Sequence, residues 1–247
     1  MRPVLAILAA LVLSTPPADA ASPFSDWAAV VISGDNLAAH VDRHTETFDN
    51  ARRDLARALQ KRGFSPANMA EFSVEPRLHP DTAPYPARLA EIDQALRRLT
   101  ARARGGCLVY LTSHGSTDGA VLGERLVTPG TLADVIDASC RGRPTVAIVS
   151  ACYSGVFIPA LAAPDRLIVT AARRDRSSFG CGEADRYPFF DACVLEALPA
   201  ATDFLALARR ARLCVARRER QEHMAPPSDP QIVIGARFHS PPFAPTS

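Results

Sequence analysis

The sequence predicts an α/β fold in which helices cover both faces of a mostly parallel sheet. Short apolar runs rich in β-branched residues alternate along the chain with longer segments of helical spacing. This alternation is typical of a parallel sheet, because each helix returns the chain to the same edge. The 247 residues suffice for one well-buried domain. Since no internal repeat suggests a second domain, residues 21–247 are expected to form a single one with its core at about 27–235.

The first twenty residues are expected to be a secretory signal peptide. Arg2 supplies the positive start, residues 4–13 are an apolar core too short to span a bilayer, and residues 18–20 (Ala-Asp-Ala) fit the cleavage rule. An uncleaved membrane anchor is the alternative. Cleavage before Ala21 predicts a periplasmic or secreted protein, without a stable membrane anchor, in an oxidising compartment.

The first half of the chain is expected to hold two strands and two helices. Each strand is a short apolar run, and each helix places apolar residues on one face. A Pro-rich loop at 78–85 precedes the second helix. The four elements are a strand at 27–33, a helix at 48–62, a strand at 69–74 and a helix at 87–103.

The second half of the chain is expected to hold four more strands of the sheet, a small hairpin and three helices. Thr128 and Pro129 mark one helix start, with Thr as the cap and Pro at the first helical position. The other two helices are expected at 187–198 and 203–223. The expected strands are 107–113, 145–151, 166–171 and 231–235, with the hairpin at 120–122 and 125–127.

Two of these strands end in reactive residues. The strand at 107–113 is followed by His114, and the strand at 145–151 is followed by Cys152. Sites in parallel sheets form beyond the carboxyl ends of the strands, so a thiol nucleophile and a general acid/base can meet there. A core histidine and an inert buried thiol are the alternatives. Ser154 is a rival nucleophile, but it lacks the G-x-S-x-G pattern and is interpreted as part of a turn into a short helix.

The motifs around these two residues resemble those of a known family. A strand ends in His-Gly at 114–115, Ala-Cys-x-Ser-Gly follows at 151–155, and Val-Thr-Ala-Ala at 169–172 leads to Ser-Ser-Phe-Gly-Cys at 177–181. This order resembles the legumain family of cysteine peptidases in the caspase-like clan, and most closely its compact bacterial members. The resemblance implies a caspase-like three-layer α/β/α sandwich with a mostly parallel six-stranded sheet.

The resemblance also implies roles for individual residues. Cys152 would be the nucleophile, and His114 would protonate the leaving amine and help to activate water. The backbone N–H groups of Gly115 and Cys152 would form the oxyanion hole, and no cofactor or metal would be needed. Ser113 stands where legumains place an Asp before the histidine, so chemistry that depends on that Asp is not expected.

Substrate recognition is expected to differ from that of legumains. Asn50 stands near the position of their pocket arginine, and Asp185 and Asp191 are the candidates for the pocket's acidic residue. Ser177 and Ser178 match a stretch that lines the pocket. Asparaginyl specificity is therefore not expected to carry over.

The remaining cysteines suggest two disulfides. Cys107 and Cys140 lie at the sheet edge opposite the reactive residues, and Cys193 and Cys214 lie on two successive helices. Buried free thiols are the alternative. Since no C-x-x-C pattern or histidine cluster occurs, a zinc site is not expected.

The predicted function is that of a cysteine endopeptidase. It would hydrolyse peptide or protein substrates through a Cys-His dyad and a thioacyl-enzyme. A transpeptidase or ligase with the same dyad and a catalytically silent binding module are the alternatives. The net charge of +2 does not suggest a nucleic-acid partner.

One predicted helix is crowded with arginines. Because Glu219 and Glu222 are interleaved with them, a solvated face is favoured over an anionic partner. The arginines are Arg209, Arg210, Arg212, Arg217, Arg218 and Arg220.

Overall fold

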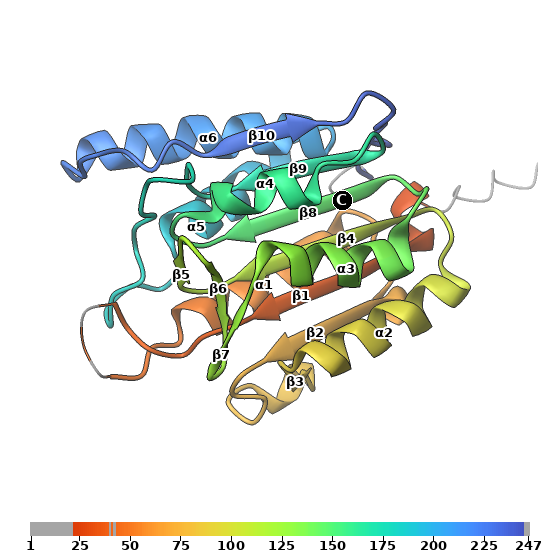
Figure 1. Cartoon of the computed structure of the whole chain (residues 1–247), viewed down its shortest axis with the longest axis horizontal. Coiled ribbons are helices and arrows are strands. Elements are labelled where there is room, and N and C mark those ends of the chain that lie inside the picture. The colour runs from red at the N-terminus through yellow and green to blue at the C-terminus, as the bar shows by residue number, and fades with distance from the viewer. Residues whose placement is uncertain (1–21, 40, 42, 245–247) are drawn as a thin grey trace, which may run out of the picture.

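The computed structural model describes residues 22–39, 41 and 43–244, so the predicted signal peptide lies outside the described residues. Its centre is a seven-stranded sheet in the order β10-β9-β8-β4-β1-β2-β3 (Figure 1). All neighbouring strands run parallel except β10, which is antiparallel to β9. The strands are β1 (Trp27–Ser33), β2 (Met69–Ser73), β3 (Tyr85–Pro86), β4 (Gly106–Thr112), β8 (Thr145–Ser150), β9 (Arg166–Thr170) and β10 (Gln231–Ile234).

The predicted α/β class and mostly parallel sheet are confirmed, with one strand more than the six expected. The additional strand is β3, at the end of the segment that was expected to be a loop. It pairs with the end of β2 through Phe72 and Ser73 only. Because Pro86 lacks a backbone N–H, it is suited to an edge strand of this kind.

Within the described part of the chain, six helices cover the two faces of the sheet. One face packs against α1 (Thr47–Lys61), α5 (Phe189–Ala197) and α6 (Phe204–Gln221). The other packs against α2 (Leu89–Arg102), α3 (Pro129–Cys140) and α4 (Ile158–Leu161), which lie in front of the sheet in Figure 1. Short 3₁₀ turns are η1 (Pro23–Asp26), η2 (Pro66–Asn68), η3 (Pro80–Thr82), η4 (Ser154–Phe157) and η5 (Leu198–Ala200). None of the described helices is both long enough and apolar enough to cross a bilayer.

The central strands are buried on both faces. In β1, Ala29 and Val31 point into the core under α1, whereas Val30 and Ile32 point into the opposite core. This follows from the two-residue period of a strand, and it explains why the strands are continuous apolar runs rather than alternating ones.

The start of α3 follows the predicted capping pattern. Thr128 is the N-cap, and its Oγ1 accepts a hydrogen bond from the backbone N–H of Thr131 at 3.2 Å. Pro129 occupies the first helical position, where a missing N–H costs nothing. This cap fixes where the crossover helix between β4 and β8 begins.

A small antiparallel sheet follows the end of β4. It consists of β5 (Gly115–Ser116), β6 (Gly119–Leu122) and β7 (Arg125–Val127), so the predicted hairpin gains a third, two-residue strand. Ser113 Oγ donates to the carbonyl of Val121 at 2.8 Å. Ser113 therefore ties the hairpin to the end of β4.

The structure has one disulfide on each face of the sheet, within the described residues. Cys107 in β4 is bonded to Cys140 at the end of α3, with a Cα–Cα distance of 6.1 Å. Cys193 in α5 is bonded to Cys214 in α6, with a Cα–Cα distance of 5.6 Å. Cys152 is a free thiol.

Candidate active site

Cys152 lies in a sharp turn directly after β8. The next residue, Tyr153, has φ of 57°, a left-handed conformation that bulky residues rarely adopt. Its backbone N–H donates to the carbonyl of Arg176 at 2.8 Å. Ser154 is fully buried, and its Oγ accepts from the N–H of Ala172 at 3.1 Å. The rival nucleophile Ser154 is thus a buried group that fastens the turn to the segment after β9.

The thiol of Cys152 contacts the backbone of Ser178. The N–H of Ser178 donates to Cys152 Sγ at 3.2 Å, and Sγ lies 3.5 Å from the carbonyl oxygen of the same residue. Burial raises the pKa of the Cys152 thiol, while the hydrogen bond from Ser178 opposes the rise.

His114 is held by groups from the loop after β1 and from α1. Its Nε2 donates to the carbonyl of Leu37 at 2.9 Å, and its ring packs edge-on against Phe48 with centroids 4.9 Å apart. Asp35 Oδ1 accepts from the N–H groups of Asn36 and Leu37, which fixes this loop. Because a carbonyl can only accept, Nε2 carries the hydrogen and Nδ1 is the basic nitrogen of the neutral ring.

His114 and Cys152 line one small pocket at the carboxyl ends of the neighbouring strands β4 and β8. Phe48, Ser178 and Cys181 are also among its lining residues. No hydrogen bond joins the imidazole to the thiol in the described chain, because each is bonded to a backbone group of its own.

Gly115 lies against the backbone of Cys152. A Cβ atom at Gly115 would lie 2.4 Å from the carbonyl oxygen of Cys152 and 2.9 Å from Cβ of Ala151. Only glycine fits this close approach. The two chain segments that carry the predicted oxyanion-hole amides are therefore in contact.

Asp191 is buried under the ends of the central strands. It accepts hydrogen bonds of 2.5 Å from Tyr110 Oη and from Thr112 Oγ1, both in β4. Burial raises the pKa of Asp191 to about 6, although bonds from Thr112, Tyr110 and Ser150 lower it. The sequence suggested Asp191 as a candidate for a specificity pocket. Its carboxylate instead joins α5 to β4 beneath the reactive residues.

The other predicted recognition residues lie at different distances from the thiol. Ser178 contacts it directly, and Ser177 Oγ lies 3.5 Å from Tyr153 Oη. Asn50 is in α1, where its Oδ1 accepts from Arg53 at 3.2 Å, and it is not among the residues that line the pocket. Asp185 Oδ2 accepts from the N–H of Gly182 at 2.7 Å, so it stabilises the loop before α5.

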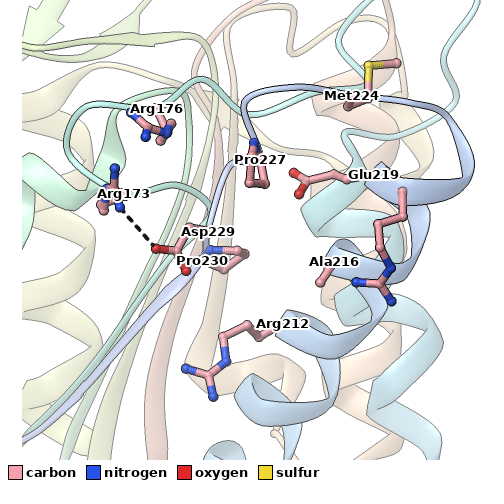
Figure 2. A pocket seen from close by; sticks show the side chains of 10 residues that line it. Arg173, Arg176, Arg212, Ala216, Glu219, Met224, Pro227, Asp229 and Pro230 are labelled. Carbon is pink, nitrogen blue, oxygen red and sulfur yellow. Dashed lines mark ion pairs between the residues drawn. The ribbon is translucent and has the colours of Figure 1, made fainter.

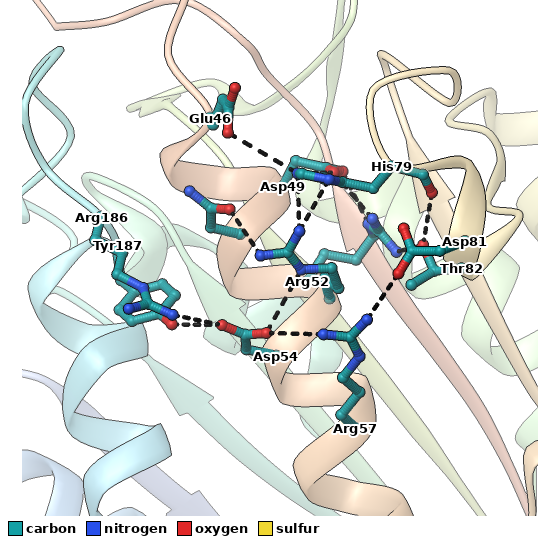
Figure 3. A network of polar contacts seen from close by, with 12 residues as sticks. Glu46, Asp49, Arg52, Asp54, Arg57, His79, Asp81, Thr82, Arg186 and Tyr187 are labelled. Atoms are coloured by element: carbon teal, nitrogen blue, oxygen red, sulfur yellow. Dashed lines mark hydrogen bonds and ion pairs between the residues drawn. The ribbon is translucent and has the colours of Figure 1, made fainter.

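A polar network fixes α1, which carries Phe48 (Figure 3). Arg52 is fully buried; its Nε donates to Asp49 at 2.8 Å, and its NH1 group bonds Glu71 in β2. Asp54 accepts a hydrogen bond of 2.5 Å from Tyr187 Oη near the start of α5. The contact between Phe48 and His114 thus rests on a helix anchored on two sides.

Phe48, Leu37 and Asp35 were not identified from the sequence as site residues. No motif marks them, since they contact or support His114 only after the loop following β1 folds across the sheet edge. Among the described residues, no group of three or more His, Cys, Asp or Glu side chains could hold a metal ion.

Known proteins resemble this chain in part of its sequence and in its fold. The Peptidase C13 family model matches residues 90–202, the part that carries His114, Cys152 and Ser178. The fold is similar to that of caspase-1 from Spodoptera frugiperda, with a TM-score of 0.62 and 17% identity, covering 92% of this chain and 96% of that one. No curated protein sequence matches. The predicted resemblance and the caspase-like fold are confirmed.

Proposed function

We propose that this chain, legumain-like in sequence and caspase-like in fold, is a cysteine endopeptidase that hydrolyses peptide bonds through Cys152 and His114. The family match and the fold support cysteine peptidase activity. The observation that carries the proposed dyad is that both side chains line one pocket at the ends of adjacent parallel strands. The presence of a thiol and an imidazole in one pocket is what nucleophilic catalysis by cysteine requires.

The first half of the proposed reaction forms a thioacyl-enzyme. Cys152 Sγ gives up its proton and attacks the carbonyl carbon of the scissile bond, and His114 Nδ1 accepts that proton. The negative charge on the carbonyl oxygen is stabilised by the backbone N–H groups of Gly115 and Cys152. As the C–N bond breaks, His114 returns the proton to the leaving amine. Loss of one oxyanion donor typically lowers the rate about 100- to 1000-fold.

The second half releases the acyl group. A water molecule attacks the thioester carbonyl while His114 takes one of its protons. The C–S bond then breaks, the product leaves with a carboxyl group, and Cys152 recovers its proton. The net reaction consumes one water per peptide bond and needs no cofactor.

Substrate contacts are proposed for Ser177 and Ser178, which belong to the loop that contacts Cys152. Asn50 lies on the helix that carries Phe48 but does not line the pocket, so any contact that it makes with substrate is expected to lie farther from the scissile bond.

We further propose that the protein works in the periplasm or outside the cell. Two disulfides among the described residues support an oxidising compartment, because such bonds are rare in a reducing cytosol. The apolar segment at 4–13 and the Ala-Asp-Ala sequence at 18–20 support export.

The test is cleavage of a diverse peptide mixture by purified protein that begins at Ala21. We expect cleavage by the wild type and a loss of at least about 1000-fold in Cys152→Ala and His114→Ala. His239→Ala is the matched control, because this exposed histidine lies outside the pocket, and it should keep full activity. Circular dichroism establishes that each variant is folded.

The same assay separates the alternatives. If an added amine nucleophile yields joined peptides in place of free carboxyl products, the protein is a transpeptidase. If the folded, reduced wild type cleaves nothing and a peptide electrophile does not label Cys152, the protein is a silent binding module and the proposed activity is wrong.

A further inference from the structure

A second pocket, separate from the one around the thiol, is lined by arginines from two elements. Arg173 and Arg176 come from the loop after β9, and Arg212 and Arg220 come from α6. Figure 2 shows the loop arginines on one side, with the helix residues across from them. The cavity volume is about 460 Å³, within the range of sites that take small molecules or a few side chains.

Two arginines on the helix side of this pocket have no carboxylate partner among the described residues. Arg173 pairs with Asp175 at 2.6 Å, and Arg176 pairs with the same carboxylate at 3.0 Å. By contrast, Arg212 and Arg220 form no ion pair with any carboxylate of the described residues. Both are exposed, so their guanidinium groups are available to a ligand. Guanidinium groups bind carboxylates with paired hydrogen bonds.

The arginines of α6 therefore divide into groups with different surroundings. Arg217 pairs with Glu196 of α5, and Arg218 pairs with Glu222 at the end of α6, as expected for a solvated face. Arg212 and Arg220 instead line the cavity. The interpretation of the helix as a solvated face accounts for the first group but not for the second.

The mixed lining of the pocket favours a peptide over a small inorganic anion. Ala216, Met224 and Pro227 add apolar surface to the lining. The carboxylates of Glu219 and Asp229 also line the cavity and would repel a compact, multiply charged anion. A peptide can place separated carboxylates against the arginines and apolar atoms against the apolar lining.

One loop connects this pocket to the thiol. The carbonyl of Arg176 accepts from the N–H of Tyr153 at 2.8 Å, and two residues later the N–H of Ser178 donates to Cys152 Sγ at 3.2 Å. The same loop therefore carries both a contact with the thiol and the two loop arginines that line the pocket.

We propose that the arginine-lined pocket binds an acidic segment of the protein substrate, close in sequence to the bond that Cys152 cleaves. The inference rests on the proposed function. The pocket thus selects acidic substrates, while the pocket around Cys152 performs the chemistry.

The test compares two peptides that share a cleavable core and differ only in flanking residues, which are Asp and Glu in one and Asn and Gln in the other. Wild type should cleave the acidic peptide with about tenfold higher kcat/KM, through a lower KM, since the added contacts affect binding alone. The double variant Arg212→Gln with Arg220→Gln should cleave both peptides with the kcat/KM that wild type shows for the neutral peptide. The matched control, Arg209→Gln with Arg210→Gln, changes exposed arginines of the same helix that do not line the pocket, and it should keep the preference.

A direct binding measurement distinguishes failure of this inference from failure of the proposed activity. Fluorescence anisotropy with the Cys152→Ala protein reports binding of each labelled peptide without any cleavage. Tighter binding of the acidic peptide, lost in the Arg212 and Arg220 variant, supports the pocket even if no peptide is cleaved. Equal binding and equal cleavage of the two peptides by wild type would overturn it. Displacement of the acidic peptide by an equal concentration of inorganic phosphate would also overturn it, because the pocket would then be a site for small anions.

Discussion

The protonation state of Cys152 controls its reactivity at the scale of single residues. Burial raises the pKa of this thiol above 9, its ordinary value, and only the thiolate is a strong nucleophile. We predict that the rate of alkylation by iodoacetamide still rises with pH above about 10, where the rate for an exposed thiol is close to its plateau. Rates measured by mass spectrometry between about pH 6 and 11 test this, since that range extends beyond the ordinary titration of cysteine.

The neighbouring thiol provides the internal control for this measurement. Burial and the proximity of Cys152 raise the pKa of Cys181 to about 12, so Cys181 should react more slowly than Cys152 at every pH. The Cys152→Ala variant gives the rate of Cys181 alone. A plateau for Cys152 near neutral pH would contradict the prediction and indicate an ion pair with His114.

Asp191 makes stability depend on pH. Its folded pKa of about 6 lies above its ordinary value of 3.8, so the folded state holds the proton more tightly than the unfolded state. Its stabilising contribution is therefore complete below pH 3.8 and is lost as the pH rises through 6. A shift of about two pKa units corresponds to about 3 kcal/mol.

We predict that Asp191→Asn removes this loss. When the pH rises from about 4.5 to 7.5, the unfolding free energy of wild type should fall by about 2 kcal/mol more than that of the variant. Urea unfolding at the two pH values measures the change. Asp118→Asn, which replaces an exposed carboxylate in the turn between β5 and β6, should show no such change. A difference between wild type and Asp191→Asn that is the same at both pH values would rule out the titration of Asp191 as the cause.

At the scale of elements, the disulfide between α5 and α6 should contribute strongly to stability. Replacing Cys193 and Cys214 together by alanine frees a loop with a sequence separation of 21 residues. The chain-entropy model gives a loss of about 3 kcal/mol in unfolding free energy, which urea unfolding of the variant and of wild type would measure.

Thiol counting gives an independent check on both disulfides. The denatured wild type should show two alkylated cysteines before reduction and six after it. The variant without Cys193 and Cys214 should show two and four, because the Cys107–Cys140 bond remains. Six alkylated cysteines in unreduced wild type would contradict both bonds.

Most elements could be predicted because local sequence and burial agree. The strand at 27–33 and the start of α3 at Thr128 were predicted to the residue, since a fully buried strand and a Thr-Pro cap leave distinct patterns. The strands β3 and β5 could not be predicted. Each has two residues, and each exists only because tertiary folding brings a partner strand alongside.

The residues of the candidate site also fall into some that could be predicted from the sequence and some that could not. His114 and Cys152 could be placed together because each directly follows a core strand of one parallel sheet. Phe48 and Asp191 are distant in sequence from both, and their contacts depend on how α1 and α5 pack. Periodicity identifies a helix face but does not show which strand end that face will touch.

At the scale of the whole molecule, the proposed export can be tested on the full chain. Expression of residues 1–247 in a secretion-competent host should yield a protein whose first residue is Ala21, as measured by intact mass and N-terminal sequencing. Replacing Ala20 by arginine should block this cleavage, because the site requires a small residue. Recovery of the unchanged wild-type N-terminus in the membrane fraction would contradict the proposal and favour the anchor.

The pocket that Cys152 shares with Cys181 has a consequence for oxidation. Thiolates attack peroxides and disulfides far faster than thiols do, and oxidation of a cysteine to the sulfinic state is essentially irreversible. Burial raises the pKa of both thiols. The same desolvation that slows the nucleophile therefore also slows its oxidation, so we expect both cysteines of the empty pocket to react with peroxide more slowly than an exposed cysteine.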